Sequence, residues 1–325
     1  MKISLVIPTY GREEVLVDSI RALLPQLESD ELIVVDQTPR HEPATEQALS
    51  AWQSSSAIRW IRRDQPSIAQ AMNAGLLASE GEVVLFLDDD IRPGSGLVSA
   101  HREAHREFPE AWGVVGQVLQ PGEHPGRRAA WTSDETLRGD LGFPFWSDER
   151  AWISNVMAGN LSVKRKRALE IGGFDENFSG SAYRFETEFA RRIVRAGGRI
   201  LFEPAARIDH LRAERGGTRA KGSHLTSASG RHGMGDYYFA LRHGRPLEAA
   251  RYILKRPFRE VATRFHLRHP WYIPVKLVGE LRALLSACVA ASRPPRLIPS
   301  NSEGGTRGIE RSADREDASV TAAGH

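Results

Sequence analysis

The chain has 325 residues, of which 41% are hydrophobic and 26% are charged, and its formal net charge is +3 at pH 7. This composition is typical of a globular protein with a sizeable core, and the near-balanced charge argues against a nucleic-acid partner. The chain has one cysteine, Cys288, so an internal disulfide and a CxxC metal site are both excluded. Such low cysteine usage is typical of proteins in a reducing compartment. Without a signal-peptide pattern or an uncharged apolar window of ~18 residues, we expect a cytoplasmic protein.

The first ~120 residues alternate apolar runs with amphipathic segments. Leu16, Ile20 and Leu23 recur at helical spacing, and Ser67 is placed to cap the helix that follows it. Strand–helix alternation predicts an α/β fold with a mostly parallel, doubly wound sheet, in which ligands bind beyond the carboxyl ends of the strands. The predicted strands cover residues 3–7, 32–36, 58–61, 83–88 and 114–119.

Three consecutive carboxylates, Asp88, Asp89 and Asp90, follow an apolar strand directly. They repel one another, and a divalent cation relieves that repulsion, since carboxylate oxygens are the ligands that Mg²⁺ and Mn²⁺ prefer. In an extended segment alternate side chains share a face, so Asp88 and Asp90 can point to one site while Asp89 points away. A solvated acidic turn is the alternative interpretation.

Two further polar segments are predicted at the same edge of the sheet. The first strand ends at Pro8 and Thr9, and Gly11 and Arg12 then precede a helix whose N-terminus favours anions. Asp36 ends the second strand, where its carboxylate could accept a hydrogen bond from a base or a ribose. Each of these features alone is also consistent with an ordinary loop.

Taken together and in order, the motifs of this chain resemble those of family 2 glycosyltransferases. The resemblance covers residues 1 to about 215. Its motifs are Ser4–Tyr10 with Arg12, Ile33–Asp36, Ala69–Gly75, Phe86–Asp90, Ala158–Ser162, Gly172–Glu176 and Glu186–Phe189.

The resemblance implies a GT-A-type, Rossmann-like fold and an inverting, metal-dependent hexosyltransferase that uses a nucleotide-diphosphate sugar. The acidic cluster matches the Asp-x-Asp motif, and a late histidine, His210, matches a position that joins the metal or the diphosphate in many such enzymes. The implied cofactor is Mn²⁺ or Mg²⁺. The implied donor-binding residues are Pro8, Thr9, Arg12, Asp36, Asn73, Asp88 and Asp89; the implied metal ligands are Asp90, Asp88 and His210.

The catalytic base is expected in a motif that usually reads Gly-Glu-Asp, followed one residue later by Glu. Here the segment reads Arg184-Phe185-Glu186-Thr187-Glu188, so Glu186 takes the position of the base and Phe185 replaces the preceding acid. An inverting transfer needs one carboxylate within hydrogen-bond reach of the acceptor hydroxyl. A glutamate in the first turn also simply suits the helix dipole.

The acceptor is expected to be a carbohydrate or a lipid-linked molecule, in the synthesis of cell-surface polysaccharide or glycolipid. The irregular, Gly-, Pro- and Trp-rich stretch 122–152 is interpreted as substrate-binding. Acceptor contacts are assigned to Trp152, Asn160 and Glu188, although Glu188 also fits a surface ion pair with Arg191 or Arg192.

The chain is accordingly divided into a catalytic domain and two appendages. The helical extension mixes basic and aromatic residues with an apolar stripe over 277–289. Such a surface could rest on an anionic membrane over residues 242–291, pack on the catalytic domain or form a homodimer. The predicted boundaries are 1–230 for the catalytic domain (1–120 nucleotide-binding, 121–230 acceptor and catalytic), 231–293 for the helical extension and 294–325 for a disordered tail.

Two other functions compete with the glycosyltransferase. The replacement by Phe185 suits a degenerate, non-catalytic protein that binds a nucleotide sugar. The segment Phe86–Asp90 also resembles the aspartate motif of haloacid-dehalogenase-like phosphatases, but those place it on the first strand and need a later acidic pair that is missing here.

Overall fold

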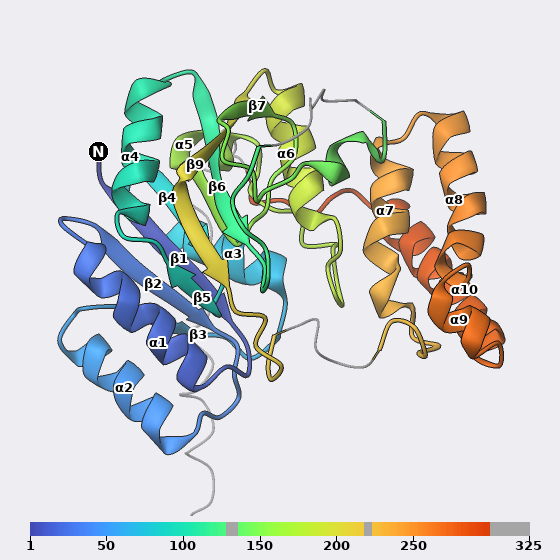
Figure 1. Ribbon diagram of the computed structural model, residues 1–325, viewed down its shortest axis with the longest axis horizontal. Helices are drawn as coiled ribbons and strands as arrows, with labels where there is room; N and C mark the ends of the chain where they lie inside the picture. The colour runs from blue at the N-terminus through green and yellow to red at the C-terminus, as the bar shows by residue number, and fades with distance from the viewer. Residues whose placement is uncertain (128–135, 218–222, 300–325) are drawn as a thin grey trace, which may run out of the picture.

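The computed structural model describes residues 1–127, 136–217 and 223–299. In these residues nine strands form a single sheet in the order β3-β2-β1-β4-β8-β6-β9-β5, with β7 paired to β9 (Figure 1). The strands are β1 (Ile3–Thr9), β2 (Glu31–Asp36), β3 (Arg59–Arg62), β4 (Val83–Leu87), β5 (Ile91–Pro93), β6 (Ala111–Leu119), β7 (Ala151–Ile153), β8 (Asn160–Lys164) and β9 (Arg199–His210).

The N-terminal half is a parallel unit. Strands β1, β2, β3 and β4 are joined by helices α1 (Glu14–Leu23), α2 (Pro43–Ser54) and α3 (Ile68–Ala78). Strands β1 and β4 are buried along their whole length, as expected for strands covered on both faces. The chain leaves β1 to build outward to β3 and then returns to the other side of β1 with β4, so α3 covers the opposite face from α1 (Figure 1).

The C-terminal half of the sheet is mixed. Strand β8 runs antiparallel to both β4 and β6, and β9 pairs in parallel with β6 but antiparallel with β5 and β7. These reversals carry the start of β8 and the end of β9 to the edge where β1, β2 and β4 end. Three helices lie between strands of this half along the chain: α4 (Leu97–Glu107), α5 (Arg165–Glu170) and α6 (Phe185–Arg195).

The predicted α/β architecture with C-terminal helices is confirmed. All five predicted strands are present. The Ser67 hydroxyl accepts from the Gln70 N–H and caps α3, as expected. The predicted doubly wound sheet is parallel through its N-terminal half, whereas β5, β7 and β8 add antiparallel pairs.

The C-terminal helices gather on one side of the sheet (Figure 1, orange to red). Helix α7 lies between α6 and the pair α8 and α10. Among the residues that the structure describes, no helix is both long enough and apolar enough to cross a membrane. The extension comprises α7 (Met234–His243), α8 (Pro246–Val261), α9 (Arg264–Arg268) and α10 (Tyr272–Ala291); three short 3₁₀ segments complete the fold at Leu24–Gln26, Gly139–Gly142 and Gly230–His232.

The segment 294–299 belongs to the predicted disordered tail, but it forms hydrogen bonds with the loop that follows α5. The Ile298 N–H donates to the Gly172 carbonyl at 2.8 Å, and the Arg296 N–H donates to Asp175 Oδ1 at 2.9 Å. Ile298 also packs against the main core. An apolar side chain with backbone partners is enough to order this short stretch, whereas residues 300–325 lie outside the described residues.

Gly116 in β6 has no room for a side chain. A Cβ there would lie 2.0 Å from the Ala206 carbonyl oxygen and 2.1 Å from Asn160 Nδ2, whereas a Cβ at Gly113 would meet nothing closer than 3.6 Å. We expect Gly116→Ala to lower the free energy of unfolding by about 1–3 kcal/mol, as for other overpacked cores, and Gly113→Ala to leave it nearly unchanged. Denaturant unfolding of both variants tests this, and equal stability would contradict the packing described at β6.

Candidate active site

A cavity of about 490 Å³ opens where β1, β2 and β4 end. It lies beyond the carboxyl ends of these strands, as ligand sites in open α/β sheets do. It brings together residues far apart in the sequence. Of the predicted site residues, Pro8, Thr9, Arg12, Asp88, Asp89, Asp90, Glu186 and His210 line it.

Asp88, Asp90 and His210 converge on the wall of this cavity. One ligand atom from each lies within 4.8 Å of the other two. His210 Nε2 is 3.2 Å from Asp90 Oδ1 and 3.7 Å from Asp88 Oδ2. Pairing of Ile91 with His210 across β5 and β9 places the imidazole beside the carboxylates. Two carboxylates and one imidazole are a donor set that fits a divalent cation.

The ionisation of this group is set by its own contacts. Burial alone would raise the pKa of Asp90, but hydrogen bonding and charge from His210, together with the charge of Arg12, lower that pKa below its usual value. The hydrogen bond to Asp90 raises the pKa of His210. Asp90 is therefore held as a carboxylate, the form that binds cations.

Gln120 is a site residue that the sequence prediction missed. Its Oε1 accepts from Arg212 Nε at 2.7 Å and lies 3.0 Å from His210 Nδ1. This amide oxygen can only accept, so His210 carries its proton on Nδ1 and directs Nε2 at the carboxylates. Such outer contacts orient metal-binding histidines in general. A lone glutamine at a strand end carries no sequence signal for this role.

Arg12 lies beneath the acidic cluster and is almost fully buried. Its Nε is 3.1 Å from Asp89 Oδ1, and its Nη2 is 3.0 Å from Asp90 Oδ2. Its Nη1 donates to the carbonyls of Ala213 and Arg215. The guanidinium predicted to contact nucleotide is thus bonded to protein groups, and it joins the acidic strand end to the loop after β9.

Asp89 points away from the cation position, as its alternation with Asp88 and Asp90 predicts. It pairs with Arg12, and burial raises its pKa to about 6 against the opposing charge of that guanidinium. The side chain nevertheless reaches the wall of the cavity. The main contact of the Asp89 side chain is therefore its ion pair with Arg12.

The loop after β9 closes over the loop after β1 through glycines. The Gly217 N–H donates to the Tyr10 carbonyl at 2.6 Å. A Cβ on Gly216 would lie 2.3 Å from the Gly11 carbonyl oxygen, and Gly216 has a φ of +87°. Only glycine meets both demands. Gly216 and Gly217 also line the cavity, so this loop forms part of its wall.

Glu186 lies in the first turn of α6 and opens onto the same cavity. Its Oε2 accepts from the Ala158 N–H at 2.7 Å, which fixes the carboxylate against the segment that leads into β8. Arg184, just before the helix, has a φ of +75°. This left-handed conformation explains why the corresponding motif usually has glycine there.

Asp36 is buried and fully engaged with protein groups. Its Oδ2 is 2.9 Å from His41 Nε2 and 3.0 Å from Trp60 Nε1, and its Oδ1 accepts from the Thr38 N–H at 2.8 Å. Burial opposes ionisation, but the His41 hydrogen bond and that backbone N–H lower the pKa of Asp36. Asp36 does not line the cavity; its neighbour Gln37 does.

Asn73 and Asn160, by contrast, join elements of the fold. The Asn73 amide accepts from the Phe174 N–H at 2.8 Å and donates to the Phe174 carbonyl at 2.9 Å, which binds α3 to the loop after α5. Asn160 is fully buried, 2.9 Å from His101 Nε2, and donates to the Ala206 carbonyl at 2.7 Å. Neither lines the cavity.

Trp152 and Glu188 also lie away from the cavity. Trp152 packs edge-on against Phe108 with ring centroids 5.7 Å apart. Glu188 pairs with Arg192 at 2.7 Å, the partner expected from their spacing, but the pair is not on the surface: Glu188 is 3% exposed. Hydrogen bonds from His243 and Arg192 lower the pKa of Glu188 despite its burial.

The sequence of this chain is similar to a known protein family and to known proteins. Residues 4–147 match the family model described as Glycosyl transferase family 2. The glucosyl-dolichyl phosphate glucuronosyltransferase of Haloferax volcanii is 24% identical over 227 residues, which cover 65% of this chain and 69% of that protein. The pre-mycofactocin glycosyltransferase of Mycobacterium tuberculosis is 24% identical over 210 residues, which cover 64% of this chain but only 42% of that protein.

Solved structures share the fold. The crystal structure of GalNAc-T7 with UDP, GalNAc and Mn²⁺ matches with a TM-score of 0.54 and 14% identity, covering 76% of this chain and 52% of that one. The crystal structure of Staphylococcus aureus TarS 1-349 matches with a TM-score of 0.55 and 14% identity, covering 87% of this chain and 81% of that one. At such identity the likeness concerns the fold.

Replacing Arg12 tests whether its charge supports the acidic cluster. Arg12→Met keeps most of the side-chain volume but leaves Asp89 and Asp90 without their buried guanidinium. We expect a loss of about 3–5 kcal/mol in the free energy of unfolding, as for other broken buried ion pairs.

Arg215→Met is the matched control. The Arg215 side chain is 80% exposed and pairs with Glu42 at the surface, so we expect a loss below about 1 kcal/mol. Denaturant unfolding at neutral pH measures both. If Arg12→Met is as stable as Arg215→Met, the buried pairing contributes nothing.

Proposed function

We propose that this chain, whose residues 4–147 match the model of glycosyl transferase family 2, is an inverting enzyme that transfers a hexose from a nucleotide-diphosphate sugar to an acceptor hydroxyl. The observation that carries the proposal is the placement of Glu186 on the same cavity as the convergent group Asp88, Asp90 and His210. One cavity thus offers a base and a place for a charged leaving group.

On the donor side, Asp88, Asp90 and His210 would hold Mn²⁺ or Mg²⁺, with the imidazole favouring Mn²⁺. When bound, such a cation neutralises the charge that develops on the departing diphosphate. Pro8, Thr9 and Gln37 line the part of the cavity beside the ends of β1 and β2, where the nucleoside would lie. Arg12 holds Asp89 and Asp90 in place and needs no ligand contact to do so.

On the acceptor side, Glu186 takes the proton from the acceptor hydroxyl while that oxygen attacks the anomeric carbon. The bond from the anomeric carbon to the diphosphate oxygen breaks in the same displacement, so the configuration inverts. The Ala158 N–H holds one carboxylate oxygen of Glu186 and so orients the base. This role distinguishes the enzyme from a degenerate, non-catalytic binder of nucleotide sugars.

Two substitutions separate donor binding from transfer. We expect Asp90→Ala to lose the thermal stabilisation that a nucleotide sugar with Mn²⁺ confers on the wild type, about 2.7 kcal/mol at a hundredfold excess over Kd. We expect Glu186→Gln to keep that stabilisation and to lose transfer by at least about 100-fold. Screening nucleotide sugars by thermal shift, then assaying transfer, measures both.

Each variant has a control in a similar setting. Asp209→Ala removes a neighbouring carboxylate that does not line the cavity, and Glu14→Gln removes a first-turn glutamate from α1. Both controls should behave as wild type. Because Asp90 also holds Arg12, Asp88→Asn, at a half-exposed side chain, repeats the cation test with less risk to folding. Full transfer activity in Glu186→Gln would refute the assignment of the base.

We also propose a peripheral membrane contact through the helical extension, in keeping with a lipid-linked acceptor for glycolipid or cell-surface polysaccharide synthesis. The similarity to a glucosyl-dolichyl phosphate glucuronosyltransferase supports such an acceptor. Leu254 and Phe258 on α8 are 70% and 75% exposed, and the exposed Arg251 and Lys255 lie on the same helix. Apolar side chains among basic ones suit an anionic lipid surface.

Vesicle sedimentation tests this contact. We expect the protein to pellet with phosphatidylglycerol vesicles and to lose that binding in the double variant Leu254→Glu, Phe258→Glu. The matched pair Leu77→Glu, Val194→Glu introduces the same charges at exposed positions outside the extension and should still pellet. Failure of the wild type to pellet would refute membrane contact.

A further inference from the structure

A second cavity, of about 470 Å³, lies where α6 meets the helical extension. Consecutive residues of one segment border both cavities: Tyr183 and Arg184 line the second cavity, and Phe185 and Glu186 line the first. A ligand in the second cavity would therefore lie next to the segment that carries the proposed base.

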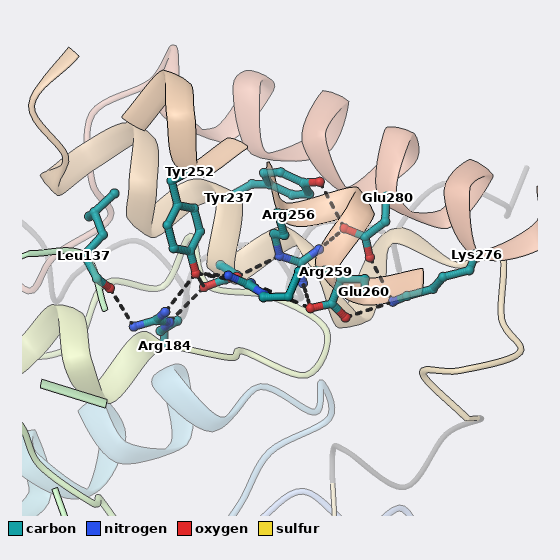
Figure 2. Close-up of polar contacts among 10 residues, drawn as sticks. Leu137, Arg184, Tyr237, Tyr252, Arg256, Arg259, Glu260, Lys276 and Glu280 are labelled. Carbon is teal, nitrogen blue, oxygen red and sulfur yellow. Dashed lines mark hydrogen bonds and ion pairs between the residues drawn. The ribbon is translucent and has the colours of Figure 1, made fainter. Parts of the chain in front are cut away.

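The inner wall of this cavity is a buried ionic network (Figure 2). Asp236 on α7 is at its centre: its carboxylate accepts from Arg184 Nε at 2.8 Å and from Arg256 Nε at 2.7 Å. The Tyr252 hydroxyl donates to it at 2.8 Å, and Arg259 Nη2 lies 3.3 Å away. Charge from Arg184 and Arg256 lowers the pKa of Asp236 against the effect of burial, so Asp236 stays ionised.

The network continues across α8 to α10 (Figure 2). Lys276 Nζ is 2.8 Å from Glu280 and 3.4 Å from Glu260. Arg256 also pairs with Glu280, which accepts from the Tyr237 hydroxyl at 3.0 Å. The carboxylates of the wall are thus each shared among several cations.

Positive charge is in excess in this cavity. Five cations line it, against two lining carboxylates, Asp236 and Glu260, and a third, Glu280, that pairs with Arg256 and Lys276 behind the wall. The five are Arg138, Arg184, Arg256, Arg259 and Lys276.

Arg138 lies outside the inner network, and Arg259 lies at its edge. Arg138 is exposed and has no hydrogen bond or ion pair with another described side chain. Arg259 Nη2 pairs with Asp236 and Glu260, but the side chain is still 34% exposed. Two histidines, His224 and His232, complete the rim. Burial and the neighbouring positive charges of His224 and Lys276 lower the pKa of His232, as a positive potential would.

A structural role alone explains the inner pairs, which bind α7, α8 and α10 to the start of α6. It does not explain why Arg138 and the exposed part of Arg259 face the open space. Guanidinium groups bind phosphate oxygens through paired N–H groups, and several around one cavity suit a phosphate more than a singly charged carboxylate.

We propose that this second cavity binds a phosphate group carried by the acceptor, which places the acceptor hydroxyl toward Glu186. The assignment rests on the proposed glycosyl transfer for the word acceptor, and on the cavity itself for the phosphate. Arg138 and Arg259 are the side chains available to the ligand, while Arg184 and Arg256 belong to the wall.

Calorimetric titration with geranyl phosphate, a soluble phosphorylated alcohol, tests the site. We expect binding to the wild type and a loss of at least about tenfold in affinity in the double variant Arg138→Gln, Arg259→Gln. The double variant Arg63→Gln, Arg106→Gln removes the same charge from exposed positions that line neither cavity, and it should bind like the wild type. Equal affinity in both double variants would overturn the site.

Two further probes identify the source of the phosphate. Geraniol should not bind; if it binds as tightly as geranyl phosphate, the contact is apolar and the proposal fails. Inorganic phosphate should bind more weakly than geranyl phosphate; if it binds equally well, the cavity is a site for free phosphate and the acceptor assignment fails.

Donor binding is measured on the same protein, as the thermal shift caused by nucleotide sugar with Mn²⁺. We expect Arg138→Gln, Arg259→Gln to keep the full shift, since neither residue lines the catalytic cavity. A wild type that binds donor but not geranyl phosphate would overturn this site alone. A wild type that binds geranyl phosphate but no nucleotide sugar would overturn the proposed function and leave the phosphate site standing.

Discussion

The buried guanidinium of Arg12 makes the contacts on which the cavity at the ends of β1, β2 and β4 depends. Asp89 and Asp90 are both nearly inaccessible to water, and two ionised carboxylates so placed would repel each other strongly. Arg12 pairs with both and also binds two carbonyls of the loop after β9. One side chain thus offsets the charge of the acidic strand end and attaches the loop whose glycines line the cavity.

The sheet topology brings the remaining groups to this point. Parallel strands deliver the ends of β1, β2 and β4, and the antiparallel pairings of β8 and β9 add the segment before β8 and His210. Residues at the start of α6 contact two different parts of the molecule. Glu186 opens onto the cavity at the strand ends, while Arg184 adopts a left-handed backbone conformation and is held by Asp236 of α7. The helical extension is therefore bonded directly to the segment that carries the proposed base.

The sequence predicts the strands and the acidic cluster well, because both depend on local patterns of burial and charge. It predicts less about polar residues whose partners come from distant segments. Arg12 looks like an anion-binding residue beside a helix N-terminus, yet its partners lie 77 and 78 positions away. Asn73 and Asn160 likewise bond backbone groups of distant segments and so join elements of the fold. Gln120 has no motif, so its contact with His210 emerges only when β6 and β9 pair.

The most direct measurement of the cation seat is a crystal structure of the protein with Mn²⁺ and the nucleotide-diphosphate sugar that stabilises it, recorded at the manganese absorption edge. A seat formed by Asp88, Asp90 and His210 predicts one anomalous peak within about 2.0–2.3 Å of their ligand atoms, with the diphosphate beside it. Nucleotide bound with no peak there, or a peak elsewhere on the chain, would contradict it.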